Sequence, residues 1–503
     1  MNTTPLWITS TSLAQFSPLK HDLSVDVAVI GGGITGITTA YLLRKVGATV
    51  ALLERDRFAE KDTGHTTAHL TYVTDTRLAE LVQNFGRDHA QAVWDAGQAS
   101  IGRLHEIAAA EEIDCEFSWV PGYLHAPQEA PEEERNLLLK DVQLAQALGF
   151  DAVFVESVPF LRVPGIRFAN QAKFHPRKYL SGLLEVLQRD GCHLFESTDG
   201  AEISDEPLSV KANGHTIRCG HVVIATHVPL QGSRGTVAAA LFQTKLAPYT
   251  SYAVGGKIPA GVVPQASFWD TAEPYEYLRV DRHAGYDYAI LGGADHKTGQ
   301  GSEPAQHFAQ IQNRLQQLFR DVKIESRWSG QVVETNDGLP YIGEAAKNQF
   351  IATGFAGNGM TFGTLSAMMA TDFVQGRNNP WSALFAPGRT KLLGGAWDYL
   401  KENKDYPYYL LKGHLSSPAK NSLDAVKRGE GKLVQHEGAK VAAFRDDNGH
   451  LTLRSAICPH MGCVVRWNGA EKTWDCPCHG SRFQATGEVI AGPAESELAE
   501  VSA

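Results

Sequence analysis

Long apolar runs and export signals are missing from this sequence. Its 503 residues contain no uninterrupted apolar run of the roughly 18 residues that a membrane-spanning helix needs. Residues 1–24 have no basic start followed by a long apolar stretch, so no secretory signal is expected, and a twin-arginine export signal is also missing. We therefore predict a protein without a transmembrane segment.

Basic residues are fewer than acidic ones in this sequence. The chain has 46 Lys and Arg against 56 Asp and Glu, which gives a formal net charge of −10. This balance argues against nucleic acid and anionic membrane surfaces as partners. With 43% hydrophobic and 20% charged residues, the composition is that of a globular enzyme with a sizeable core.

Cysteine is scarce as well, because the chain has only 7. Four of them lie together near the C-terminus, while Cys115, Cys192 and Cys219 are scattered along the chain. This usage fits a reducing compartment best, so we expect the cytoplasm.

The C-terminal cysteines form a recognisable ligand pattern. Cys458-Pro-His460 is followed, after fifteen residues, by Cys476-Pro-Cys-His479. In a Rieske [2Fe–2S] cluster two thiolates hold one iron and two imidazoles hold the other. Zinc is the alternative, but zinc sites usually pair Cys with Cys and His with His, whereas this chain interleaves them. We predict that Cys458, His460, Cys476 and His479 bind the cluster and that the protein transfers electrons.

The strings CPHMGC and CPCHGS resemble the Rieske proteins of respiratory and photosynthetic cytochrome complexes. The resemblance implies a disulfide between Cys463 and Cys478 that clamps the two cluster-binding loops. It also implies a hydrogen bond from the Ser481 hydroxyl to a cluster sulfur, which raises the reduction potential. The respiratory proteins have Tyr two residues after that Ser. This chain has Phe483, so we expect a potential below the respiratory values. Residues 492–494 resemble the proline loop that shields the cluster.

The N-terminal region has the pattern of a dinucleotide-binding turn. A buried strand over residues 25–30 leads into Gly31-Gly-Gly33-Ile-Thr-Gly36 and then into a helix. Gly31 permits the tight turn, Gly33 lets the backbone approach a pyrophosphate, and Gly36 permits close packing of helix on strand. A second strand ends at Glu54, whose carboxylate is placed to accept the adenosine ribose hydroxyls.

Later segments favour FAD over NAD. Residues 350–354 form a second strand-to-glycine junction, and residues 357–363 begin a helix. The positive end of that helix suits the flavin N1–C2=O edge, which becomes anionic on reduction. With the turn at 337–343 and the strand at 221–226, these segments resemble the FAD-binding elements of the D-amino-acid-oxidase-like superfamily. That superfamily includes glycine oxidase, sarcosine oxidase and γ-glutamylputrescine oxidase.

The two halves together resemble the bacterial Rieske-type FAD-dependent oxidoreductases, in which residues 64–71 correspond to a loop along the flavin. The resemblance implies an α/β fold: a Rossmann-like FAD-binding domain with an interleaved antiparallel-sheet substrate domain, followed by a small all-β Rieske domain. The FAD-binding residues that it implies are Gly31, Gly33, Gly36, Glu54, Thr66, Thr67, Gly354, Gly357, Asn358, Gly359 and Met360.

The expected domain boundaries follow from this assignment. The flavin part covers residues 25–385, and the Rieske domain covers 421–503, with a linker at 386–420. Within the flavin part, the FAD-binding segments are expected at about 25–110, 150–230 and 325–385, and the substrate segments at about 111–149 and 231–324.

Some superfamily members join FAD to a His, and both His65 and His69 lie in the corresponding region. A loop beside the pyrophosphate and flavin also uses His for hydrogen bonds alone. No Cys stands at 328–338, where sarcosine oxidases carry their flavin-linking Cys. We expect noncovalent FAD.

Superfamily members oxidise a C–N bond by hydride transfer to flavin, usually without an essential side-chain base. The resemblance therefore implies a small-molecule amine or amino-acid substrate. Arg279 alternates with Tyr275 and Tyr277 along one strand, and its planar fork is suited to a substrate carboxylate. The alternative is that Arg279 forms a salt bridge with Glu276 or Asp281.

Two functions are open from the sequence. In the first, a flavin dehydrogenase relays single electrons through the cluster to an external acceptor. In the alternative, an amine oxidase passes electrons from FAD to O2 and the cluster is structural or redox-sensing. A Rieske oxygenase is disfavoured, because those enzymes carry a large iron domain after the cluster domain and only 24 residues follow His479.

Overall fold

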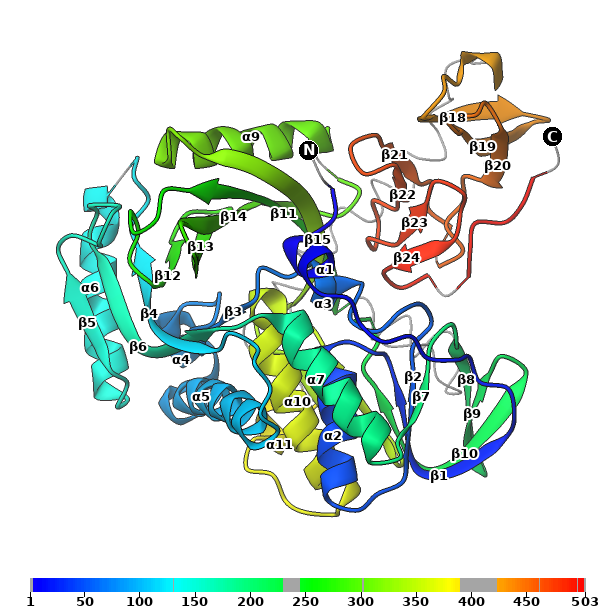
Figure 1. Cartoon of the computed structure of the whole chain (residues 1–503), viewed down its shortest axis with the longest axis horizontal. Helices are drawn as coiled ribbons and strands as arrows, with labels where there is room; N and C mark the ends of the chain where they lie inside the picture. Colours follow the sequence, from blue (N-terminus) through cyan, green and yellow to red (C-terminus); the bar gives the residue numbers. More distant parts are fainter. Residues whose placement is uncertain are drawn as a thin grey trace.

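A computed structural model describes residues 3–129, 131–228, 245–300, 303–389, 423–460, 462–494 and 496–501. The chain folds into an N-terminal part with two large sheets and a C-terminal part with two small ones (Figure 1). Most of the linker expected at 386–420 lies outside the described residues. None of the helices in the described ranges is long and apolar enough to cross a membrane.

The first sheet is built around β1, whose last four residues are all buried. A strand buried on both faces is typical of a parallel sheet covered by helices. The sheet runs in the order β16 (Tyr341–Ala346), β17 (Gln349–Thr353), β10 (His215–Ile224), β1 (Leu23–Ile30), β2 (Val50–Leu53) and β7 (His193–Phe195). All neighbours are parallel except β16 and β17, and the hairpin of β8 (Gly200–Asp205) and β9 (Leu208–Ala212) extends the sheet through β10.

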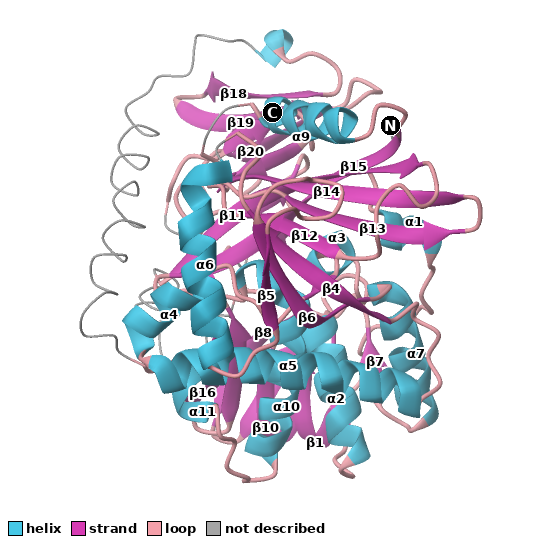
Figure 2. Ribbon diagram, turned by 90° about the vertical axis from the view of Figure 1, so that its left-hand side faces the viewer, coloured by secondary structure: helices cyan, strands magenta, loops and turns pink. Residues whose placement is uncertain are grey.

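Helices α2 (Ile34–Lys45) and α10 (Gly359–Val374) pack on one face of this sheet. Helix α7 (Pro176–Arg189) packs against α2, and α5 (Arg87–Ala110) packs against α10, and the four helices lie together in Figure 2. Helix α7 begins with Pro176 in its first turn, and the ring of His175 accepts the backbone N–H of Lys178. The buried side chains of these helices join those of β1 and β2 in one hydrophobic core.

The second sheet is mainly antiparallel and lies above these helices in Figure 2. Its order is β15 (Lys323–Thr335), β11 (Leu246–Ile258), β14 (Tyr286–Lys297), β13 (Tyr277–His283), β12 (Ser267–Asp270), β4 (Ser118–His125), β6 (Gly165–Lys173) and β3 (His69–Leu70), with β5 (Ala152–Val155) beside β6. Helix α9 (Pro304–Leu318) covers β11 and β14. The remaining helices are α1 (Leu6–Ser10), α3 (Asp62–His65), α4 (Leu78–Phe85), α6 (Pro131–Ala147) and α11 (Ser382–Phe385).

The second sheet also includes strands from segments expected to bind FAD. Strands β5, β6 and β15 fall in segments expected to bind FAD, yet all three pair within the antiparallel sheet. The reason is long-range pairing: β15 forms an antiparallel ladder with β11 from Leu246 to Lys257. Local sequence patterns identify such strands but not the sheet that they join.

The C-terminal part is all β. One sheet has the order β18 (Glu430–His436), β19 (Ala439–Arg445) and β20 (Leu451–Ser455). The other has the order β21 (Arg466–Asn468), β22 (Thr473–Asp475), β23 (Arg482–Gln484) and β24 (Val489–Ala491). A separate hydrophobic core around Trp474 and Phe483 stabilises the sheet formed by β21 to β24.

The two parts of the chain are joined by buried polar contacts at β15. The Arg482 side chain is buried and bonds to Asp475 at 3.1 Å and to Glu471 at 2.8 Å. Its guanidinium also lies 3.4 Å from the Ser329 hydroxyl, and that hydroxyl donates to Glu471. Gln331 extends the contact by donating 2.8 Å to the carbonyl of Gly480.

Candidate functional site

A cavity of about 320 Å³ opens where the two large sheets and the C-terminal domain meet. Its walls come from the glycine turn, the end of β2, the loop 61–75, the start of α10, strands β11 and β15, and residues 490–494. A volume in this range suits a ligand of substantial size.

The glycine turn leaves space that a side chain would fill. Gly31 adopts a φ of 106°, and a Cβ there would collide with the carbonyl of Ala225. A Cβ on Gly36 would collide with the carbonyl of Gly31, so Gly36 permits close packing although it does not line the cavity. Gly33 stands immediately before α2 and lines the cavity. The open backbone and the positive helix end fit a pyrophosphate.

Glu54 follows β2 and faces the same cavity. Its carboxylate accepts the N–H of Gly32 at 2.8 Å and that of Asp56 at 2.8 Å. Burial raises the pKa of Glu54, and these two hydrogen bonds oppose the rise. The carboxylate is thereby fixed in place and retains lone pairs that fit ribose hydroxyls.

The opposite end of the cavity is formed by the start of α10. Gly357, Asn358, Gly359 and Met360 line it, whereas Gly354 lies behind the wall with a φ of 75°. The Asn358 amide donates to the carbonyls of Thr71 and Val73, and Thr361 donates to Thr71. Asn358 therefore anchors the loop beside the helix, and the helix N-terminus faces the cavity as a flavin N1–C2=O edge requires.

The loop before β3 brings four further sequence-predicted residues to the cavity. Thr66, Thr67, His65 and His69 all line it. His65 donates through Nδ1 to the carbonyl of Lys61 at 2.9 Å. Burial lowers the pKa of His69 to about 4, so its ring is neutral at physiological pH. Noncovalent FAD stays a prediction.

Arg279 does not reach the cavity, which corrects the hypothesis that it holds a substrate carboxylate. Its Nε lies 2.9 Å from Asp281, and Nη1 and Nη2 donate to the carbonyls of Ala68 and Phe174. The guanidinium is 2% exposed, and Lys173 approaches the same Asp281 at 3.2 Å. The loop at 67–68 covers Arg279 at this end of β13. The structure therefore supports the alternative, in which Arg279 forms a salt bridge with Asp281.

Two loops of the C-terminal domain bring the predicted cluster ligands together. Each loop is closed by a backbone hydrogen bond: the N–H of Cys458 donates to the carbonyl of Cys463 at 2.8 Å, and the N–H of Cys476 donates to the carbonyl of Ser481 at 2.7 Å. The buried Cys458 and Cys476 side chains contact each other. The His460 and His479 rings lie 4.9 Å apart between centroids.

The two imidazoles of the donor set have the protonation that a Rieske cluster requires. Burial lowers the pKa of His460 to about 4 and that of His479 to about 3, so both imidazoles are neutral. Two buried thiols beside two neutral imidazoles match the two-Cys, two-His ligand set.

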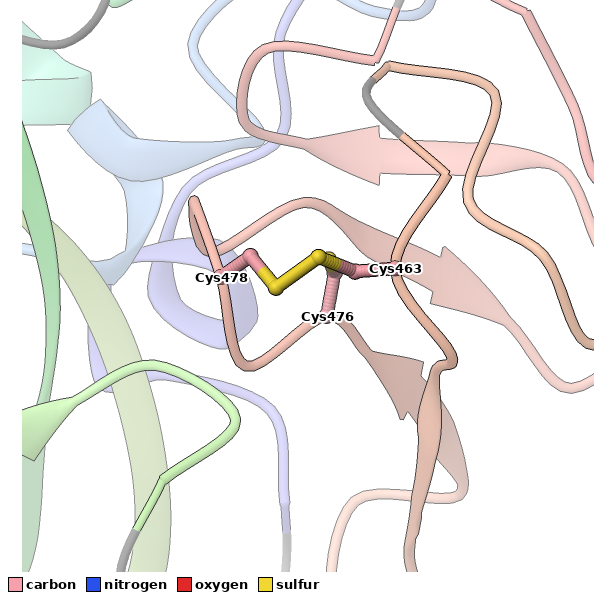
Figure 3. A group of neighbouring side chains, drawn as sticks. All are labelled: Cys463, Cys476 and Cys478. Atoms are coloured by element: carbon pink, nitrogen blue, oxygen red, sulfur yellow. A yellow bond between two sulfur atoms is a disulfide. The ribbon is translucent and has the colours of Figure 1, made fainter. Parts of the chain in front are cut away.

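Cys463 and Cys478 form a disulfide between the two loops, as predicted (Figure 3). Their Cα atoms are 6.4 Å apart. The sulfur of Cys476 lies within 4.8 Å of both sulfurs. Because the other two are bonded to each other, only Cys476 of this trio offers a thiolate to a metal.

Ser481 and its surroundings are also buried. The Ser481 Oγ accepts the N–H of Ala494 at 3.1 Å, a contact that leaves the hydroxyl hydrogen to point elsewhere. A Cβ on Gly492 would lie 2.6 Å from the Cα of Ser481, so the 492–494 loop covers this residue closely. Phe483 is buried opposite Trp474.

Among the residues that line the cavity and that sequence reasoning missed are Asp75, Ser251, Asp295 and Gln331. Asp75 accepts the N–H of Gly357 at 2.8 Å, and Ser251 lies 2.8 Å from the hydroxyl of Tyr277. Burial raises the pKa of Asp295 to about 7. No motif marks these residues, because they come from separate strands and loops that only the fold brings together.

Comparisons with known proteins match both parts of the chain. The family model described as FAD dependent oxidoreductase matches residues 26–373, and the model described as Rieske [2Fe-2S] domain matches residues 419–502. The chain is similar to YhfW of Bacillus subtilis (strain 168), named as a Rieske 2Fe-2S iron-sulfur protein, with 34% identity over 98% of this chain and 97% of that protein.

Two further matches concern the parts separately. The cytochrome b6-f complex iron-sulfur subunit 1 of a Nostoc species is 58% identical over 45 residues, which are 9% of this chain and 25% of that subunit. Glycine oxidase from Geobacillus kaustophilus has a similar structure, with a TM-score of 0.61 and 19% identity over 73% of this chain and 99% of that chain. At this identity the likeness shows the fold alone.

Changing Ser481→Ala tests its predicted hydrogen bond to the cluster. Loss of the bond destabilises the reduced state, so we expect the potential to fall by about 60 mV for each 1.4 kcal/mol lost. Phe483→Tyr adds a hydroxyl and is expected to raise the potential. Redox titration followed by electron paramagnetic resonance measures both, and an unchanged potential in the two variants contradicts the assignment.

Changing Arg279→Met tests its structural role. Asp281 then loses its buried partner, which is expected to lower the free energy of unfolding by about 3–5 kcal/mol. The exposed pair of Arg377 and Asp372 provides the control, since Arg377→Met should cost less than about 1 kcal/mol. Thermal unfolding measures both. If Arg279→Met raises the KM for substrate but leaves the free energy of unfolding unchanged, the structural role of Arg279 is wrong.

Proposed function

Because the chain belongs to the FAD-dependent oxidoreductase family and carries a Rieske domain, so that its cofactors are FAD and a [2Fe-2S] cluster, we propose that it oxidises the C–N bond of an amine or amino-acid-like substrate. In this proposal single electrons pass through the cluster to an external acceptor. When bound, FAD supplies two-electron chemistry and the cluster supplies one-electron chemistry.

The observation that carries the proposal is the shared wall of the two sites. Residues 490–494 of the C-terminal domain line the cavity beside the glycine turn. Within the same loop, Ala494 donates its N–H to Ser481, next to the second cluster-binding loop. A cluster that served an unrelated purpose would not require this contact.

Gln331 forms a specific contact between the cavity wall and the cluster domain. It lines the cavity, and its amide donates to the carbonyl of Gly480 at 2.8 Å and to Thr298 at 3.3 Å. Gly480 directly follows the ligand His479. One side chain therefore contacts both the flavin cavity and the cluster loop, which supports electron transfer within one chain.

Close docking of the cluster loop supports the same proposal. A Cβ on Gly299 would lie 2.6 Å from the backbone of Cys476, and one on Gly480 would lie 2.6 Å from Pro248. The loop that carries two cluster ligands is thus packed directly on β11 and on the turn after β14.

We place the reaction in the cytoplasm. Cys115, Cys192 and Cys219 are free thiols, which supports a reducing compartment. The disulfide of Cys463 and Cys478 is partly enclosed by the domain core, so its presence fits that compartment.

Anaerobic reduction tests the relay. The holoenzyme is mixed with a panel of amines and amino acids, and the flavin and cluster absorption bands are followed separately. We expect the cluster to be reduced after the flavin. If the cluster stays oxidised while the flavin is reduced, and peroxide forms stoichiometrically when air is admitted, the enzyme is an oxidase and the relay is wrong.

The variant Gln331→Leu tests whether the contact between the cavity wall and the cluster loop supports electron transfer. It removes the contact between the cavity wall and Gly480, so cluster reduction should slow while flavin reduction keeps its rate. Gln300→Leu is the control, because Gln300 also donates to the cluster loop, at 2.7 Å to the carbonyl of Pro477, but does not line the cavity.

A further inference from the structure

The cations that line the cavity lie in one segment, whereas its carboxyl groups are spread along the wall, from Glu54, Asp62, Asp75, Asp199 and Asp295. Its Lys and Arg residues in the described part of the chain are Arg55, Arg57 and Lys61, and all three follow Glu54 at the ribose end. Arg57 is paired with Glu196 and Lys61 with Asp56. The other end, beside the start of α10, contains two carboxyl groups.

Asp75 is the first of these carboxyl groups. Its Oδ2 accepts the backbone N–H of Gly357 at 2.8 Å and the hydroxyl of Tyr275 at 3.3 Å. A Cβ at position 357 would lie 2.6 Å from both of those side-chain oxygens. Glycine at 357 therefore allows the carboxylate to lie against the helix start.

Asp295 is the second carboxyl group and comes from β14. Its Oδ1 is buried and has no hydrogen-bond partner in the described residues. Burial raises the pKa of Asp295 to about 7; the neighbouring Ser251 opposes the rise and the charge of Asp75 adds to it. A buried carboxyl oxygen that faces a cavity without a protein donor is available to a donor on a ligand.

Aromatic side chains form the walls between the two carboxyl groups. The ring centroids of Tyr275 and Tyr277 lie 5.6 Å apart. The ring of His69 lies edge-on to that of Tyr277, with 5.7 Å between centroids. Trp269 also lines the cavity. Aromatic faces bind alkyl chains and attract ammonium groups.

Nearby buried cations do not balance these carboxyl groups. Arg279 and Lys173 both contact Asp281, and neither lines the cavity. His69 is neutral at physiological pH because burial lowers its pKa to about 4. An incoming carboxylate would therefore meet two acids and no cation from the described residues.

From this arrangement we infer that the substrate is a cationic amine without a carboxylate beside the reacting carbon, held through its ammonium group by Asp75 and Asp295. Amines of the alkylamine and diamine class meet this description, whereas α-amino acids do not. The inference rests on the proposed function and narrows it, since that function admits both classes.

Matched probes test the inference on the holoenzyme under anaerobic conditions. The pairs differ by one carboxylate: methylamine and glycine, 1,4-diaminobutane and ornithine, 1,5-diaminopentane and free lysine. Binding is measured from the perturbation of the flavin absorption spectrum. We expect the amines that bind to do so at least about tenfold more tightly than their carboxylated partners, a preference equivalent to about 1.4 kcal/mol.

Two variants identify the residues responsible. Asp295→Asn and Asp75→Asn each remove one charge and keep an acceptor oxygen, so each should weaken binding of the amines by at least about tenfold. Binding of the carboxylated partners should not weaken. If the two residues had only a structural role, their substitution would weaken binding of both classes. Asp321→Asn is the control, because Asp321 is exposed in the turn after α9.

The outcomes separate this inference from the proposed function. Amine binding without flavin bleaching supports the charge preference and contradicts C–N oxidation. Equal or tighter binding of the carboxylated partners overturns the inference, even if the flavin is bleached. Failure of all three amines to perturb the spectrum, or an unchanged preference in both Asp variants, also overturns it.

Discussion

The buried charge network at Arg482 is the constraint on which the rest of the structure depends. Arg482 bonds to Asp475 and Glu471 within its own domain and contacts Ser329 on β15. Removing one charge from such a network leaves the others buried and uncompensated. The network thus fixes one orientation of the cluster domain, in which the 490–494 loop completes the flavin cavity. The proposed electron transfer between the two sites requires that orientation.

Different parts of the cavity wall suit different parts of the bound molecules. The glycine turn, Glu54 and the cations after it provide the environment of a dinucleotide. The start of α10 and the two carboxyl groups provide that of a flavin ring and, in our inference, of a cationic substrate. Arg279 lies behind the wall, where it neutralises Asp281 and supports the loop at 67–68. A residue type suited to binding a carboxylate is here used for packing.

The sequence was sufficient wherever function depends on a local pattern. The cluster ligands and the two glycine-rich segments are contiguous motifs with fixed spacing. The disulfide of Cys463 and Cys478 was implied by the resemblance of CPHMGC and CPCHGS to known Rieske proteins. The substrate end was not predictable, because Asp75, Ser251 and Asp295 lie on separate elements and meet only through sheet pairing. The same limit explains Arg279: its strand was correctly identified, but the loop that covers it comes from more than two hundred residues earlier in the chain.

The central claim is that one chain carries electrons from the flavin cavity to the cluster. Stopped-flow measurement of cluster reduction at several enzyme concentrations, with substrate saturating and oxygen excluded, tests it most directly. The account predicts a rate constant that is independent of enzyme concentration, since the two sites share a wall. A rate that rises in proportion to enzyme concentration, or a cluster that is never reduced, would contradict it.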